Sequence, residues 1–178
     1  SEGTYPLPEA QIDRFLMKVV VDYPSRSEEA AVVDRSLGEP AQARERLSLE
    51  QLERFAHATQ AVLVDREVIG YAVALADATR RPEAHGLEDV ASFIEFGASP
   101  RGPIGLVQAA RALAMLRGRG YVAVADVRDL AADVLRHRLV LSYDALTEDV
   151  TADDILERVL ATVEEPPADH ITRRVSAA

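Results

Sequence analysis

Residues 97–120 read GASPRGPIGLVQAARALAMLRGRG, which predicts a turn, a helix and a second turn in succession. The glycines and the proline of Gly97–Gly102 favour a tight turn, since glycine tolerates unusual backbone angles and proline fixes φ. Apolar side chains then recur at helical spacing, so we expect a helix from about Ile104 to Arg117, ended by Gly118-Arg119-Gly120. Arg101 therefore stands just before a helix N-terminus, where oriented backbone N–H groups favour an anion.

The remainder of the sequence is patterned mainly for helices. Five further helices are expected, and four of them begin with a capping residue followed by apolar side chains at helical spacing. These helices run from Ser25 to about Leu37, from Ser48 past Phe55, from Asp65 past Ala76, from Asp126 to about His137, and from Thr151 to the Pro166-Pro167 pair. We interpret residues 80–90 as a surface loop and the tail from about residue 166 as mobile. The predicted fold class is therefore mainly α, a helical bundle.

The first 24 residues have a different pattern. Two prolines before residue 9 predict an extended start, and a short helix is expected over Glu9–Phe15. The continuous apolar run Met17–Tyr23 then predicts a buried strand. Because a strand without a partner strand cannot complete a sheet, we interpret residues 1–24 as the last pieces of an α/β domain whose body lies outside this sequence.

Composition excludes several classes of protein. The 178 residues (19.4 kDa) are 48% hydrophobic, which is enough apolar surface for a folded core. The absence of cysteine excludes disulfides, cysteine-ligated zinc and a cysteine nucleophile. A net charge of −10 argues against nucleic-acid or anionic-membrane binding as the main role. Because neither an uncharged apolar run of about 18 residues nor a signal segment occurs, we expect a cytoplasmic protein without membrane insertion.

The basic residues are unusual in kind and in distribution. Of the twenty, nineteen are arginine and only Lys18 is lysine. A phosphate-binding P-loop requires the order Gly-Lys-Ser/Thr, and Lys18 does not stand in one, so this chain cannot carry its own P-loop. Between Arg101 and Arg138 there are seven arginines and only three aspartates, a local charge of +4. Arginine suits phosphate because its planar fork donates two hydrogen bonds at once, although such arginines can equally form solvated helix faces.

Other catalytic and metal-binding patterns receive no support. Glu53 and His57 lie one turn apart on a predicted helix, and we assign them to a solvated pair rather than to half of a metal site. Asp65 follows an apolar run, as a magnesium-binding aspartate would, but it serves better as a helix cap. No Gly-x-Ser-x-Gly occurs for serine hydrolysis. We therefore expect no metal site in this chain.

Several motifs, taken together, resemble those of one family. Residues Glu2–Leu16, EGTYPLPEAQIDRFL, are very similar to the conserved segment after sensor 1 in MoxR-family AAA+ ATPases. Residues Gly97–Arg101, GASPR, resemble the sensor 2 motif of the same family. Further similarity lies, in the family's order, at Tyr23-Pro24-Ser25, Ala78-Thr79-Arg80, Gly118–Val122, Asp126-Val127 and Leu135–Leu139. The resemblance thus covers nearly the whole chain.

This resemblance implies a domain organisation. Residues 1–24 would be the C-terminal remnant of an AAA+ α/β core, with the arginine-finger segment and the last strand. Residues 25–178 would form the helical lid domain that carries sensor 2. Because Walker A, Walker B and sensor 1 are absent from this sequence, the chain alone is expected to hold no nucleotide and to be inactive.

The resemblance also implies particular site residues. Arg14 would be the arginine finger, which reaches in trans to the γ-phosphate held by a neighbouring subunit. Arg101 would be the sensor 2 arginine of its own subunit's nucleotide, with Ser99 and Pro100 beside it in the cofactor-binding turn. Both roles have a physical reason, since fixed guanidinium groups stabilise the charge that spreads over the phosphoryl oxygens as the β–γ bond breaks.

The cofactors and partners implied are those of the family. The full-length protein would bind ATP and Mg²⁺ between core and lid, at the subunit interfaces of a ring, usually a hexamer. Such rings remodel or mature client proteins in a chaperone-like way, commonly with a von Willebrand factor A-domain partner. One alternative remains open at this point: a non-catalytic helical adaptor that binds a protein partner through the basic surface Arg101–Arg138. Nucleic-acid binding is disfavoured by the net acidity.

Overall fold

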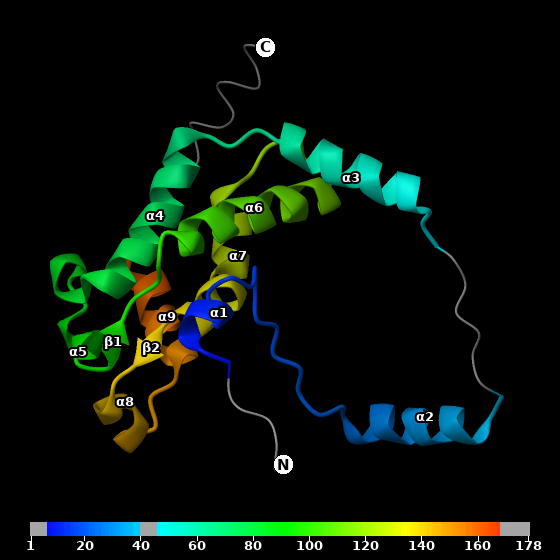
Figure 1. Cartoon of the computed structure of the whole chain (residues 1–178), viewed down its shortest axis with the longest axis horizontal. Helices are drawn as coiled ribbons and strands as arrows, with labels where there is room; N and C mark the ends of the chain where they lie inside the picture. Colours follow the sequence, from blue (N-terminus) through cyan, green and yellow to red (C-terminus); the bar gives the residue numbers. More distant parts are fainter. Residues whose placement is uncertain (1–6, 40–45, 168–178) are drawn as a thin grey trace.

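The structure is a computed structural model that describes residues 7–39 and 46–167. Figure 1 shows α4, α6, α7 and α9 gathered into one helical body, with α1 against it, α3 beside α6, and α2 set apart. The prediction of a mainly helical fold is confirmed. The elements in chain order are α1 (Glu9–Ile12), α2 (Arg26–Leu37), α3 (Leu49–Ala61), α4 (Arg66–Arg80), the 3₁₀ turn η1 (Pro82–His85), α5 (Glu88–Ala91), β1 (Ile94–Phe96), α6 (Arg101–Leu116), α7 (Val124–Leu135), the 3₁₀ turn η2 (Arg136–Arg138), β2 (Val140–Leu141), α8 (Tyr143–Thr147) and α9 (Ala152–Thr162).

The predicted helix caps are all present. Three helices begin with a full capping box, in which a hydroxyl accepts from the N–H three residues later and the side chain there accepts from the capping residue's own N–H. The pairs are Ser25 with Glu28, Ser48 with Gln51, and Thr151 with Asp154. The carboxylate of Asp65 caps α4 by accepting from the N–H of Glu67 at 3.0 Å. Each such cap contributes about 1 kcal/mol, so these four helix starts are fixed locally.

The core lies where α4, α6, α7 and α9 meet. Close packing of α6 against α7 depends on small residues, since a Cβ added to Gly102 would lie 3.0 Å from a methyl of Leu135, and one added to Gly105 would lie 3.1 Å from Val134. The largest fully buried apolar side chains are Leu75, Leu87, Leu106, Leu135, Ile155 and Leu156. Truncating a buried leucine of this kind to alanine costs about 2–5 kcal/mol.

The structure differs from the sequence prediction in its short elements. Residues 80–90, expected to be a loop, contain η1 and the start of α5, and Leu87 between them is fully buried. Strands β1 and β2 form a two-stranded antiparallel sheet, with Ile94 opposite Leu141. Helix α6 begins at Arg101, three residues before the predicted start, so Arg101 is in the first helical turn rather than ahead of it.

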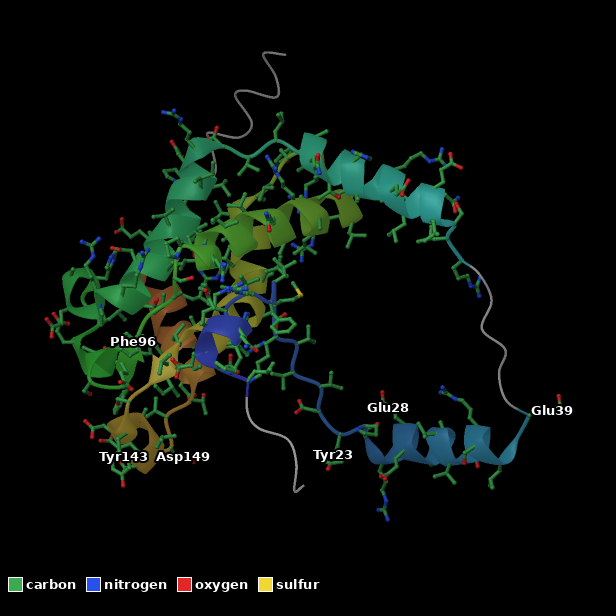
Figure 2. All side chains as sticks on the ribbon, in the orientation of Figure 1. Tyr23, Glu28, Glu39, Phe96, Tyr143 and Asp149 are labelled. Carbon is green, nitrogen blue, oxygen red and sulfur yellow. The ribbon has the colours of Figure 1, made fainter. Side chains whose placement is uncertain are left out.

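The largest correction concerns Met17–Tyr23. This segment is extended, but within the described residues it pairs with no strand, and the predicted burial is wrong for most of it. Met17 packs on the core, whereas Val21 is 87% exposed and Tyr23 fully exposed. Figure 2 shows Tyr23 on the extended chain between α1 and α2, away from the helical body. A strand buries its two faces only inside a sheet, and the described residues offer no neighbouring strand to build one.

Two helices also leave apolar side chains in solvent. No residue of α2 is buried, and α3 exposes about half or more of Leu49, Leu52 and Phe55. Helix α3 is joined to the body by its C-terminal link, where the N–H of Leu63 donates to Gly120 at 2.9 Å. Of the predicted mobile tail, residues 168–178 lie outside the described residues. Among the described helices, none has the length and apolar character needed to cross a bilayer.

Candidate functional site

The turn that leads into α6 is fixed against α4. The N–H of Ala98 donates to the hydroxyl of Thr79 at 2.9 Å, and that hydroxyl donates to the carbonyl of Ala76 at 2.7 Å. Thr79 is fully buried. A Cβ on Gly97 would lie 2.3 Å from the carbonyl oxygen of Thr79, so no larger residue fits there. The backbone of α4 therefore sets where the residues after Ala98 emerge.

Ser99 and Arg101 emerge beside the carboxylate of Asp13. The Ser99 hydroxyl lies 2.9 and 3.0 Å from the two carboxylate oxygens and donates to that group, while it accepts from the N–H of Arg101 at 3.2 Å. The Nη1 of Arg101 lies 3.5 Å from Asp13 Oδ2, and the Arg101 side chain is half exposed. Pro100 is the N-cap of α6 and is exposed. The structure thus joins Ser99 and Arg101, and adds an acidic partner that the sequence analysis did not single out.

Arg138 binds the other oxygen of the same carboxylate. Its side chain is only 2% exposed, and its Nη1 lies 3.0 Å from Asp13 Oδ1. The same guanidinium donates to the main-chain carbonyls of Asp13, Val134, Phe15 and Leu16. With its donors used in this way, Arg138 is a structural residue that fixes residues 13–16 to the helical body.

Arg136 and His137 extend this attachment to Lys18. Arg136 donates to the carbonyl of Lys18 at 2.6 Å, and its charge is met by Asp133 and Asp153. The Nε2 of His137 lies 3.1 Å from the carbonyl of Phe15. We call Arg136, His137 and Arg138 the η2 clamp. No role was predicted for these three residues. Their contacts with residues 13–18 could not be inferred, because they join parts of the chain more than 115 residues apart.

The surroundings of His137 favour its neutral form. Burial is the main cause that lowers its pKa, and the adjacent Arg138 charge acts in the same direction, while the hydrogen bond to Phe15 partly opposes them. Within the described chain its Nδ1 is buried without a hydrogen-bond partner. A neutral ring that donates from Nε2 to the Phe15 carbonyl fits both observations.

A cavity of about 790 Å³ opens beside these residues. It lies between α1 and residues 17–19 on one side and η2 with β2 on the other, and Asp13, Gly97 and Ser99 reach its wall. The lining is mainly apolar, with a few convergent polar groups, as in many ligand sites. In the part of the chain that the structure describes, no group of three or more His, Asp or Glu side chains is arranged to hold a metal ion.

Arg14 is exposed and stands outside this network. Its backbone N–H donates to Gln11 at 3.2 Å, which ends the short α1 turn. Across residues 7–39 and 46–167, no acidic side chain lies within ion-pair distance of its guanidinium. The structure therefore places Arg14 next to Asp13 in the chain but does not bring it into the cluster with Ser99 and Arg101.

Most of the predicted basic surface is neutralised. Arg117 and Arg119 both bind the buried carboxylate of Asp126, which also accepts from the N–H of Ala123 at 2.8 Å. Burial alone would raise the pKa of Asp126, but the hydrogen bonds from Arg119 and Ala123, with the arginine charges, outweigh it and lower that pKa. Arg128 forms a more exposed ion pair with Glu165. Most arginines of the surface Arg101–Arg138 are therefore already paired with carboxylates of the same chain, and this weakens the adaptor hypothesis.

Comparison with known proteins gives the class of this helical body. Residues 87–159 match the family model of the AAA lid domain. This span includes the turn with Ser99 and Arg101, helices α6 and α7, the η2 clamp and most of α9. The helical body is an AAA lid domain.

The relatives narrow the family further. The chain is 45% identical to Chaperone MoxR1 of Mycobacterium tuberculosis over 97% of its length, and 33% identical to Protein MoxR of Paracoccus denitrificans over 94% of its length. Its fold matches the crystal structure of an inferred ATPase from Cytophaga hutchinsonii, with a TM-score of 0.88 and 35% identity over 93% of this chain. The chain belongs to the MoxR family of AAA+ proteins. It spans about half the length of these relatives: 46% of MoxR1, 53% of the Paracoccus protein and 51% of the solved chain.

Proposed function

We propose that this chain is the lid region of a MoxR-type AAA+ ATPase and that Arg101 is its sensor 2 arginine. Under this proposal residues 1–24 close the α/β core and residues 25–178 form the lid. The observation that carries it is the state of Arg101: a half-exposed guanidinium in the first turn of a long helix, held by one loose ion pair at 3.5 Å. Charge-assisted hydrogen bonds are normally about 2.7–2.9 Å long, so Arg101 is free to exchange partners.

The chemistry follows from that geometry. The triphosphate would be held by the core's P-loop, and bound ATP with Mg²⁺ supplies the phosphoryl group to be transferred. Arg101 would bind a γ-phosphate oxygen, and the N-terminal N–H groups of α6 would add favourable dipoles. Ser99 and Pro100 would set the approach of that helix end. Because Arg101 belongs to the lid, its contact with the γ-phosphate would couple the lid angle to the state of the nucleotide.

Arg14 is proposed as the arginine finger that acts in trans. Its exposure, and the absence of an acidic partner among the described residues, leave its charge available to another molecule. An arginine supplied in this way is worth about 10³–10⁵ in turnover in related phosphoryl transfers.

The partners are proposed from the family. We propose that the full-length protein forms an ATP-dependent ring, a hexamer, in the cytoplasm, and acts on client proteins together with a von Willebrand factor A-domain protein. The name of the relative Chaperone MoxR1 supports a chaperone-like role. The adaptor alternative has less support, because five of the seven arginines of its surface are engaged in ion pairs within the chain.

The test begins with the coding sequence upstream of Ser1, which should contain Gly-x-x-x-x-Gly-Lys-Ser/Thr. In the full-length protein, Arg101→Ala should lower the ATP hydrolysis rate about 10²-fold and Arg14→Ala by about 10³-fold or more. Arg158→Ala is the matched control, because among the described residues this exposed arginine pairs only with the exposed Asp89. Normal hydrolysis in either site variant would remove that arginine from the mechanism, and a reading frame without the P-loop would reject the proposal.

A further inference from the structure

The carboxylate of Asp13 is shared by three groups of the lid. Ser99 donates to it, Arg138 binds one oxygen at 3.0 Å, and Arg101 lies 3.5 Å from the other. Asp13 is itself part of the N-terminal segment and immediately precedes Arg14. One side chain therefore connects the start of α6, the η2 clamp and the residue proposed as the arginine finger.

The two arginines on this carboxylate are held very differently. Arg138 is buried, and its other donors bind the backbone carbonyls of Val134 and of three residues in the segment 13–16. Arg101 is half exposed and makes the longer contact. An incoming anion would therefore displace the Arg101 contact first, while Arg138 would keep Asp13 in place.

The η2 clamp ties the backbone around Arg14 to the lid. Residues 13, 15, 16 and 18 each offer a main-chain carbonyl to Arg136, His137 or Arg138. The N–H of Lys18 adds a bond to the carbonyl of Asp133 at 2.8 Å. A rotation of the lid would thus carry the backbone of Arg14 with it, because these bonds join the segment to α7 and η2.

We propose that Asp13 is a positioning residue that couples Arg101 to Arg14. In the absence of phosphate, Asp13 holds the Arg101 side chain at the N-terminus of α6. When a γ-phosphate binds Arg101 instead, the lid shifts. The segment bound by the η2 clamp then moves Arg14 relative to the neighbouring subunit. The inference rests on the proposed function of the two arginines. It adds a physical connection through which the nucleotide bound to one subunit affects ATP hydrolysis in the neighbouring subunit.

The test is a pair of double-mutant cycles on ATP hydrolysis by the full-length protein. Asp13→Asn keeps the shape and the acceptor for Ser99 but removes the charge that holds Arg101. We expect it to lower kcat about tenfold with an unchanged KM for ATP. If Asp13 acts through both arginines, adding Asp13→Asn to Arg101→Ala, or to Arg14→Ala, should lower the rate by less than twofold further.

The controls separate positioning from stability. Asp89→Asn removes an aspartate from an exposed ion pair on the same domain and should leave kcat and both cycles unchanged. The melting temperature of each variant is measured alongside. Ser99→Ala removes the uncharged hydrogen bond to the Asp13 carboxylate and should also lower kcat, but by less than Asp13→Asn does. A full tenfold loss in either double variant overturns the coupling. If instead Arg101→Ala and Arg14→Ala themselves hydrolyse ATP normally, the proposed function fails.

Discussion

Arg119 binds the fully buried carboxylate of Asp126 with both of its terminal nitrogens, one of them at 2.7 Å. This pair connects the turn after α6 to the first turn of α7. Because Arg117 and the N–H of Ala123 bind the same carboxylate, all of its oxygen lone pairs have partners near the helix start. A buried charge that is met in this way fixes geometry, and removal of the carboxylate leaves two partly exposed guanidinium groups and the N–H of Ala123 without this partner.

Replacing Asp126 with alanine should therefore destabilise the chain by about 1.5–3 kcal/mol at pH 7, the range for lost hydrogen bonds to a charged group. The pKa of Asp126 is lowered in the folded chain, against about 3.9 when unfolded. Its contribution is thus present above about pH 4 and is lost as the pH falls through the lowered folded value. Urea unfolding of wild type and variant between pH 7 and 2.5 should show the two stabilities converging at the acid end. Asp129→Ala, at an exposed aspartate, is the control and should cost about 0–1 kcal/mol. A difference that persists undiminished at pH 2.5 would contradict the assignment.

Gly97→Ala should destabilise the lid by about 1–3 kcal/mol or more, because its methyl would lie 2.3 Å from the carbonyl oxygen of Thr79, which is backbone and cannot rotate away. The same change would displace Ser99 and Arg101, so in the full-length protein hydrolysis should fall as well. Gly120→Ala is the matched control, since its Cβ would meet nothing within 4 Å. Thermal unfolding of both variants measures the difference, and equal melting temperatures would show that the turn is not packed as described.

Acid pH should loosen residues 13–18 from the lid. The pKa of His137 is lowered mainly by burial, so the docked segment favours the neutral ring. Docking stability is therefore complete above the unfolded value of about 6.5 and is progressively lost as the pH falls below it. Hydrogen exchange, corrected for the intrinsic pH effect, should report faster exchange of the Lys18 amide at pH 5.5 than at pH 7.5. His137→Gln should remove that pH dependence, whereas His57→Gln, on α3, should leave it intact. Exchange that is independent of pH in the wild type would exclude this role for His137.

Local signals in the sequence were sufficient for the long helices and insufficient for the site. Ser25, Ser48 and Thr151 act on residues three positions away, so their capping boxes could be predicted from spacing alone. The turn with Ser99 and Arg101 was found because its residue types are distinctive, and the family followed from motifs in order along the chain. The partners of Arg101 and the role of Arg138 were not predictable, because Asp13 lies 125 positions from Arg138 and no periodic pattern links them. The sheet of β1 and β2 was missed for the same reason, since two or three residues carry no period of their own.

The exposed valines of Met17–Tyr23 allow a test of a segment in which a continuous apolar pattern did not predict burial correctly. Val20 is 54% exposed in this chain, so Val20→Thr should change its unfolding free energy by no more than about 0.5 kcal/mol. The same substitution at the fully buried Val134, which faces α6, should cost about 1–3 kcal/mol because a hydroxyl is placed in the core without a partner. Under the proposed function the core supplies the missing neighbour strand, so Val20→Thr should become costly in the full-length protein. Urea unfolding of both variants in both proteins measures this, and an equal, small effect of Val20→Thr in the two would show that the segment stays in solvent even when the core is present.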